Sequence, residues 1–248
     1  MLEFQGITRR FGALAAVDDL SFTVQPGEFV ALVGVSGSGK STLLKTVNRL
    51  VLPDAGTVRI DGEDAASLPL ARLRRRVGYV FQEIGLFPHM TVGENVAIGP
   101  RLAGRPLTRE RVEQLLEQVE LAPGLTARMP AALSGGQRQR VGVARALATG
   151  PKLLLMDEPF GALDPITRAA LSERVRALHG ELGMTTVMVT HDMAEALLLA
   201  GRVLVMDAGR IVADETPQAL LAGAGGPVAQ ALVAVPREQA KRLAGLAP

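Results

Sequence analysis

The pattern of apolar and polar residues divides the 248-residue chain into short apolar runs separated by longer mixed stretches. Nearly continuous apolar runs of strand length predict strands that are buried on both faces. Such runs occupy residues 28–33, 77–81, 153–156 and 185–190. Between them, apolar residues recur at helical spacing, as do Leu43, Leu44, Val47, Leu50 and Val51 before Pro53. Alternation of this kind predicts an α/β fold with a mainly parallel sheet.

Other strand patterns predict an antiparallel β flap beside this sheet. Residues 2–8 and 20–24 have the character of short strands, and residues 57–61 alternate before the hairpin signal Asp61-Gly62. Residues 202–206 and 210–213 flank a turn at 207–209 and predict a last strand pair.

Residues 88–150 change character and are expected to be helical. Thr108 is the expected N-cap of one helix, without a capping box because Arg111 stands where Glu or Gln belongs. A second helix is expected to follow Ser134 and to end near Ala148. Residues 217–248 are rich in Ala, Gly and Leu, and they predict short terminal helices without visible chemistry.

The clearest chemical signal lies between the strand at 28–33 and the helix that follows it, where the chain reads G-x-x-x-x-G-K-S-T. The residues are Gly34, Val35, Ser36, Gly37, Ser38, Gly39, Lys40, Ser41 and Thr42. Glycines let successive N–H groups turn toward phosphate oxygens, and the helix N-terminus adds its dipole. The pattern predicts that Lys40 reaches the β- and γ-phosphates and that the Ser41 hydroxyl ligates Mg²⁺. The other interpretation, a glycine-rich turn with a chance lysine, is disfavoured by the flanking strand and helix.

Polar residues follow three predicted strands at the edge where open α/β sheets bind ligands. Gln82 follows the strand at 77–81, Asp157 and Glu158 end the run at 153–158, and His191 follows residues 185–190. Asp157 is placed to hold Mg²⁺ directly or through water, and Glu158 to polarise a water aimed at the γ-phosphate. Each has a structural alternative. Gln82 would be a surface amide, Asp157 and Glu158 would mark a strand that meets a polar loop, and His191 would be a structural imidazole.

Two positions leave two interpretations open. Phe11 is expected in the loop between the first two strands, where it either stacks on an adenine ring or belongs to the core. Ser134, Gly135 and Gly136 are expected at a helix N-terminus, where they form either a second anion site or an ordinary serine N-cap, which the local pattern favours.

Composition narrows the class of protein further. Apolar residues make up 48% of the chain, yet no run approaches the roughly 18–20 residues of a membrane helix. The N-terminus lacks the shape of a signal peptide, and the absence of cysteine excludes disulfides and is compatible with a reducing cytosol. A formal charge of +2 gives no global attraction to nucleic acid. The local cluster Arg72, Arg74, Arg75 and Arg76 indicates a solvated helix face rather than a polyanion patch.

The order of these motifs resembles that of the ATP-binding cassette (ABC) ATPases over nearly the whole chain. The residues that carry the resemblance are the phosphate loop, Gln82, the signature Leu133-Ser134-Gly135-Gly136-Gln137, the acidic strand at 153–158, the Asp164 turn and His191. The resemblance implies one ABC ATPase domain over residues 1–248. Its parts would be a RecA-like core with antiparallel β strands at 1–87 and 151–216, a helical subdomain at 88–150, and a short tail at 217–248.

The resemblance also implies a mechanism in which two identical cassettes pack head to tail around two ATP molecules. Lys40 and the loop amides would hold the phosphates on one side, and Ser134, Gly135, Gly136 and Gln137 of the partner chain would contact them on the other. Ser41, Gln82 and Asp157 would arrange Mg²⁺. Glu158 would be the general base, with His191 on the γ-phosphate and Gln82 beside the reacting groups. Phe11 would stack on adenine, and Asp164 would lie in the turn that meets the partner chain.

Partners follow from the same resemblance. A cassette of this kind would power uptake through separate integral-membrane permease subunits, with Phe87 and Pro88 as the expected permease contact and a solute-binding protein as an indirect partner. The stretch from Gly85 to Asn95 resembles that of importer ATPases for glycine betaine, choline or carnitine. Importers of polar amino acids or sulfonates, and a non-transport cassette, remain alternatives. We further expect the chain to lie at the cytoplasmic face of the inner membrane. We expect no nucleic-acid partner and no sensing through C-terminal CBS domains.

Overall fold

The computed structural model describes residues 1–245, which form two compact units. The first unit comprises residues 1–68 together with the described residues from 187 onward, and the second unit comprises residues 69–186. The division falls within strand β8 (Thr185–Thr190), which is buried along its whole length. This strand has the bounds that the apolar pattern predicts.

An antiparallel sheet occupies part of the first unit, with the strand order β2-β1-β4-β5. Its strands are β1 (Leu2–Phe11), β2 (Leu14–Val24), β4 (Ala55–Ile60) and β5 (Glu63–Asp64). The predicted flap and the Asp61-Gly62 turn are confirmed. The placement of Phe11 in a loop is wrong, because Phe11 ends β1 and pairs with Leu14. A tight turn at 12–13 lets both strands continue beyond their apolar segments.

The first unit also contains the hydrogen-bonded strands β10 (Arg210–Glu215), β9 (Arg202–Asp207) and β3 (Phe29–Val33). Strand β3 is buried at every residue and pairs with β9 in parallel, as expected of an apolar run with helices nearby. Helix α1 (Lys40–Val47) follows the phosphate loop. It ends earlier than predicted, because Arg49 takes a left-handed conformation with φ 55° and leaves Leu50 outside the helix.

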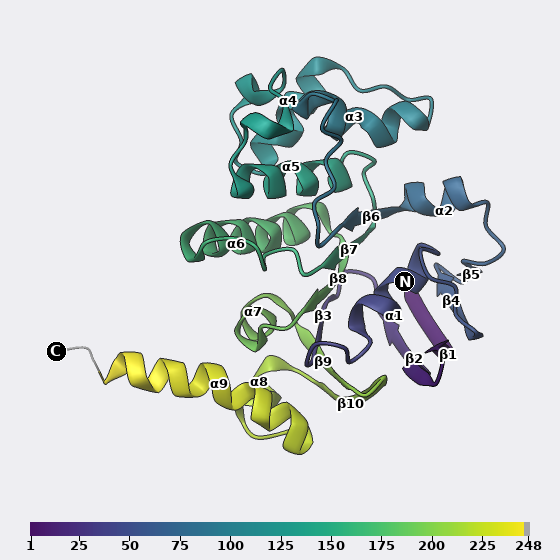
Figure 1. The fold of residues 1–248 in the computed structure, drawn as a ribbon, viewed down its shortest axis with the longest axis vertical. Helices are drawn as coiled ribbons and strands as arrows, with labels where there is room; N and C mark the ends of the chain where they lie inside the picture. The colour runs from purple at the N-terminus through teal and green to yellow at the C-terminus, as the bar shows by residue number, and fades with distance from the viewer. Residues whose placement is uncertain (246–248) are drawn as a thin grey trace. The chain divides into compact units, whose positions relative to one another are not determined.

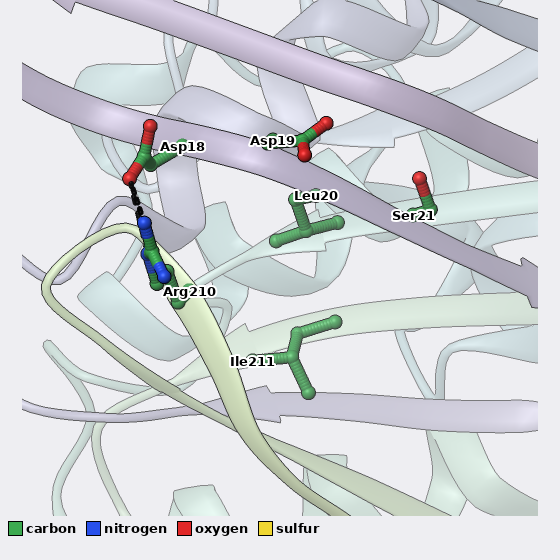
Figure 2. Close-up of a pocket in the computed structure, with 6 residues that line it drawn as sticks. All are labelled: Asp18, Asp19, Leu20, Ser21, Arg210 and Ile211. Atoms are coloured by element: carbon green, nitrogen blue, oxygen red, sulfur yellow. Dashed lines mark hydrogen bonds and ion pairs between the residues drawn. The ribbon is translucent and has the colours of Figure 1, made fainter.

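A salt bridge connects two strands of the first unit. Figure 2 shows Arg210 of β10 reaching Asp18 of β2, with Nε and Nη2 at 3.0 and 2.7 Å from Asp18 Oδ2. Leu20 and Ile211 lie beside this pair and line the same pocket. The hollow therefore has a paired arginine and carboxylate at one end and apolar side chains in its wall.

Three helices complete the first unit after β8. They are α7 (Met193–Leu199), α8 (Pro217–Leu221) and α9 (Gly226–Ala244). Helix α9 is longer than the short terminal helices that the sequence suggests; Pro227 lies in its first turn, where proline is tolerated, and the helix continues through Pro236. The part of the predicted tail at 246–248 lies outside the described residues.

The second unit combines a parallel strand pair with most of the helices. Strands β6 (Val77–Val80) and β7 (Leu153–Asp157) pair in parallel, and both are buried. Its helices are α2 (Leu70–Arg76), α3 (Val92–Leu102), α4 (Arg109–Gln118), α5 (Gly135–Leu147) and α6 (Pro165–Leu182), with short 3-10 turns η1 (Pro123–Leu125) and η2 (Pro130–Ala132). Helices α3, α4 and α5 lie together in Figure 1 and contact one another.

Side-chain caps fix where these helices begin. Thr108 caps α4 by accepting from the Arg111 amide at 3.3 Å, as predicted and without a capping box. Thr91 and Glu94 form a complete capping box at the start of α3, which the pattern analysis did not single out. All three helices of this group fall within the predicted helical region at 88–150. Among the described residues, no helix has the length and apolar character needed to cross a membrane.

Candidate nucleotide site

The phosphate loop connects β3 to α1, and two of its glycines are required by close backbone contacts. Gly34 has φ +158°, and a Cβ atom there would lie 2.1 Å from the Met206 carbonyl oxygen. Gly39 has φ +104°, and a Cβ atom there would lie 1.9 Å from the Ala16 carbonyl oxygen. The loop is therefore packed against β9 and β2 so tightly that only glycine fits at both positions.

We expect Gly39→Ala to damage both stability and nucleotide binding. The substitution combines a left-handed backbone with a steric overlap, which together cost about 2–5 kcal/mol of unfolding free energy. Urea unfolding and ATP titration of the full chain measure the two effects. Gly180→Ala is the matched control, because Gly180 lies in α6 with open space around its Cβ position. Equal stability of the Gly39 variant and the wild type would contradict the packing argument.

Lys40 is nearly buried at the start of α1, and its ammonium group faces the loop backbone. Its Nζ lies 2.8 Å from the Gly34 carbonyl oxygen, 2.9 Å from that of Val35 and 3.2 Å from Ser38 Oγ. The same unit positions the half-buried Ser41 as the second residue of the helix. The side-chain charge and the helix N-terminus thus converge on one loop, as an anion site requires.

Two other predicted residues belong to the first unit. Phe11 is 49% exposed, and Arg9 lies over its ring with the guanidinium carbon 4.6 Å from the ring centre. It is therefore a surface aromatic and not a core residue, so adenine stacking remains the open interpretation. His191 is exposed and follows β8 directly, at the carboxyl end of that strand.

The carboxyl end of β7 carries both predicted acids. Asp157 is the last residue of the strand and is 1% exposed, while Glu158 follows it and is half-buried. The Tyr79 hydroxyl of β6 lies 3.4 Å from Asp157 Oδ2. Burial, with the nearby Asp157 carboxylate, raises the pKa of Tyr79 well above its ordinary value of 10.0. Sequence reasoning missed this neighbour, although Tyr79 is the only tyrosine in the chain and lies in a buried strand.

The raised pKa of Tyr79 gives a prediction for pH dependence. The folded state holds a proton that the unfolded state releases above about pH 10, so unfolding free energy falls as pH rises beyond that value. Because the chain has one tyrosine and no tryptophan, the absorbance of tyrosinate near 295 nm reports this residue alone. We expect no tyrosinate signal from the folded protein at pH 10.5 and a normal titration in urea. A normal titration in the folded protein would contradict the buried placement.

Gln82 and Glu158 are brought together within the second unit. Gln82 Nε2 donates to Glu158 Oε2 at 3.3 Å, so the residues after β6 and after β7 meet as the parallel pairing predicts. Glu158 has φ +45°, a conformation uncommon for a residue other than glycine. Backbone strain of this kind concentrates at functional positions, where surrounding structure holds it in place.

The signature residues occupy the first turn of α5. Ser134 is the N-cap, its hydroxyl accepts from the Gln137 amide at 3.2 Å, and the Gln137 side chain accepts from the Ser134 amide at 3.0 Å. Ser134 and Gly135 are exposed, and a Cβ atom on Gly136 would lie 2.5 Å from Thr167 Cγ2 of α6. The serine is thus a true N-cap, and the same turn presents an exposed hydroxyl at a helix N-terminus.

Asp164 caps α6 by accepting from the Thr167 amide at 3.0 Å, and this hydrogen bond lowers the pKa of its carboxyl. Asp164 lies in the turn at 161–165, which the resemblance to ABC ATPases associates with a partner chain. Phe87 and Pro88 lie on an exposed segment after β6, and Phe87 is 41% exposed. Their role in binding a permease stays a prediction.

The donor types at the predicted metal positions suit magnesium. They are a hydroxyl at Ser41, an amide oxygen at Gln82, whose nitrogen is engaged with Glu158, and a carboxylate at Asp157. Within residues 1–245, no group of three or more carboxylate or imidazole side chains is arranged to hold a metal ion by itself. Mg²⁺ commonly binds one or two protein oxygens together with water and substrate phosphates, and each of these three oxygen types is one that it accepts.

The phosphate loop between a buried strand and a helix, with acids at the end of a parallel strand, defines a P-loop nucleotide-binding protein. Residues 17–161 match the family model described as ABC transporter. The glycine betaine uptake system ATP-binding protein YehX of Escherichia coli K12 is 51% identical over 223 residues, which cover 89% of this chain and 72% of that protein. The glycine betaine/carnitine/choline transport ATP-binding protein OpuCA of Bacillus subtilis 168 is 46% identical over 224 residues, 89% of this chain and 59% of that protein.

Solved structures agree with this family. The dimeric structure of a post-hydrolysis state of the ATP-binding cassette MJ0796, bound to ADP and Pi, superposes with a TM-score of 0.80. It is 33% identical in sequence, and the match covers 88% of this chain and 99% of that one. The chain belongs to the ABC transporter family, as an ATP-binding cassette. The predicted α/β fold and the resemblance to ABC ATPases are therefore confirmed.

Proposed function

We propose that this chain hydrolyses ATP as a homodimer and thereby powers uptake of a quaternary-amine osmoprotectant through separate permease subunits. The substrate class includes glycine betaine, choline and carnitine. One observation supports this class above the others, namely the 51% identity to a glycine betaine uptake protein over 89% of the chain. The chain spans 59% of the length of OpuCA, so the solute and partners are assigned here as a proposal.

In the proposed reaction, each ATP lies between the phosphate loop of one chain and the signature of the other. Lys40 and the loop amides bind the phosphates, and Phe11 stacks on the adenine. The exposed first turn of α5, with Ser134 and Gly136, caps the γ-phosphate of the partner's nucleotide. Binding thus draws two surfaces together around one triphosphate, and loss of the γ-phosphate favours their separation.

The proposed hydrolysis assigns proton transfer to Glu158. Its carboxylate accepts a proton from the attacking water. Gln82 orients this carboxylate through the hydrogen bond from Nε2 to Glu158 Oε2 at 3.3 Å. His191 contacts the γ-phosphate from the end of β8. Ser41, Gln82 and Asp157 would hold Mg²⁺, which would neutralise charge on the phosphate oxygens. Asp164 holds the turn that meets the partner chain.

The permease contact is proposed to involve Phe87 and Pro88. An exposed aromatic ring beside a proline offers an apolar contact of the kind that dominates protein interfaces. Docking there would place the chain at the cytoplasmic face of the membrane, with a solute-binding protein acting through the permease.

The test is ATP hydrolysis by the full chain assembled with its permease subunits in lipid nanodiscs. We expect glycine betaine with its binding protein to stimulate hydrolysis, and the same complex with Glu158→Gln to stay inactive. Stimulation by a sulfonate or a polar amino acid instead would move the assignment to the alternative importers. Stimulation by nucleic acid, without association with a membrane protein, would contradict a role in transport.

A further inference from the structure

The segment 84–91 connects the Gln82 position to α3, and one buried side chain binds its second half. Asn95 of α3 is fully buried. Its Oδ1 accepts from the Phe87 amide at 2.8 Å, and its Nδ2 lies 3.1, 3.1 and 2.9 Å from the carbonyl oxygens of Phe87, Met90 and Thr91. Every one of these contacts is to backbone atoms, so Asn95 fixes the path of the chain rather than any one side chain.

A second side chain, half-buried, binds the first half of the same segment. Arg145 of α5 donates from Nη1 to the Gly85 carbonyl oxygen at 2.8 Å and from Nη2 to that of Ile84. Burial lowers the pKa of Arg145. Gly142, one turn earlier on α5, lets Ile84 pack closely, since a Cβ atom there would lie 2.9 Å from Ile84 Cγ2. The first half of the segment is therefore hydrogen-bonded near the C-terminal end of α5, the helix whose N-terminal end carries the signature.

These contacts distinguish the segment from an ordinary exposed loop. Gly85 has φ +56°, and a segment with such a turn and an exposed Phe87 ring would bend easily if its backbone groups bonded only to water. Two helices instead supply polar groups to the carbonyls of five residues, 84, 85, 87, 90 and 91. A displacement at one end of the segment is then transmitted to its other end.

We infer that Asn95 and Arg145 are positioning residues that hold 84–91 as a rigid connection between Gln82 and the exposed Phe87. The inference rests on the proposed function for its role in coupling, because Gln82 is assigned to the nucleotide and Phe87 to the permease. Neither side chain touches a reacting group. Their effect is to make the Gln82 end and the Phe87 end move together with α5 and α3.

The first test measures amide hydrogen exchange of the full chain without nucleotide. Asn95→Leu is expected to speed exchange of amides 87–91 by about tenfold or more, because the Phe87 amide loses its acceptor and three carbonyls lose a donor. Asn48→Leu is the matched control, since Asn48 is the only other asparagine and is also buried. Asn95→Asp keeps the shape of the side chain and the oxygen that accepts from the Phe87 amide, but it removes the Nδ2 donor. It therefore replaces the leucine variant in this test if that variant does not fold.

Arg145→Met provides the corresponding change at the other half of the segment. We expect faster exchange at 84–86, whereas Arg138→Met, an exposed arginine on the same helix, should leave it unchanged. Unchanged exchange at 84–91 in the Asn95 and Arg145 variants would overturn the inference. So would equal acceleration in the Asn48 and Arg138 controls, because the effect would then be general destabilisation.

The second test measures whether nucleotide binding changes the surroundings of residue 87. The chain has no tryptophan, so Phe87→Trp in the Glu158→Gln background gives a single fluorescent reporter. We expect MgATP to change its emission, and Asn95→Leu to remove at least half of that change while ATP affinity stays within about twofold. A reporter that ignores bound ATP would overturn the inference. Absence of ATP binding would instead refute the proposed function, and the exchange test would still judge the two positioning residues.

Discussion

Substitution of Glu158 by Gln is expected to reduce ATP hydrolysis by about two to four orders of magnitude, because a general base contributes that much to such a step. Glutamine keeps the size of the side chain and its contact with Gln82 but cannot accept the proton. The left-handed backbone at residue 158, with φ +45°, accommodates either residue. ATP should therefore still bind, and dimers that require ATP should accumulate because they no longer consume it.

Phosphate release and sedimentation velocity measure the two halves of this prediction. Glu173→Gln is the control, since Glu173 is an exposed glutamate on α6 that belongs to no motif. The control should match the wild type in both assays. Full hydrolysis by the Glu158 variant would remove Glu158 from the mechanism, and its failure to dimerise with MgATP would show that the triphosphate does not join two chains.

The second large effect concerns complementation between two inactive variants. Lys40→Ala removes the ammonium group from the phosphate loop, and Ser134→Asp places a negative charge beside the proposed γ-phosphate position. Aspartate is also a good N-cap, so helix α5 should keep its start. Each variant alone should have almost no activity, because both sites of its dimer carry the same defect.

An equimolar mixture should recover activity. About half of the dimers are then mixed, each with one intact site, so up to about a quarter of wild-type activity is expected. Ser134→Asn is the control for the charge, because it keeps the cap and remains neutral. A mixture that stays as inactive as its components, although mixed dimers form, would place the phosphate loop and the signature in the same chain's site.

The apolar pattern predicted the fold well where burial alone decides the structure. Strand β8 has the predicted bounds, and β3, β6 and β7 differ from prediction by one residue, because continuous apolar runs have one stable location. The pattern failed where hydrogen bonding or a backbone turn decides. Helix α1 stops at Val47 although Leu50 and Val51 continue its apolar spacing, since Arg49 reverses the chain.

Only those residues of the site that belong to a sequence motif could be predicted. The strand pattern placed Gln82 and Glu158 at the same edge of the sheet, and in the structure Gln82 Nε2 donates to Glu158 Oε2. The Tyr79 hydroxyl beside Asp157 was missed because a tyrosine in an apolar strand gives no sign of its partner. Asn95 and Arg145 were likewise invisible as positioning residues. Their partners are backbone amide and carbonyl groups, so no pattern of side chains marks them.

A crystal structure of the Glu158→Gln chain with MgATP would show directly whether two chains share each nucleotide. We expect two chains with each triphosphate held by Lys40 of one and Ser134 of the other, and with Asp157 and Ser41 at the metal. A structure in which ATP occupies the phosphate loop while Ser134 faces solvent in every assembly would contradict a site shared between two chains.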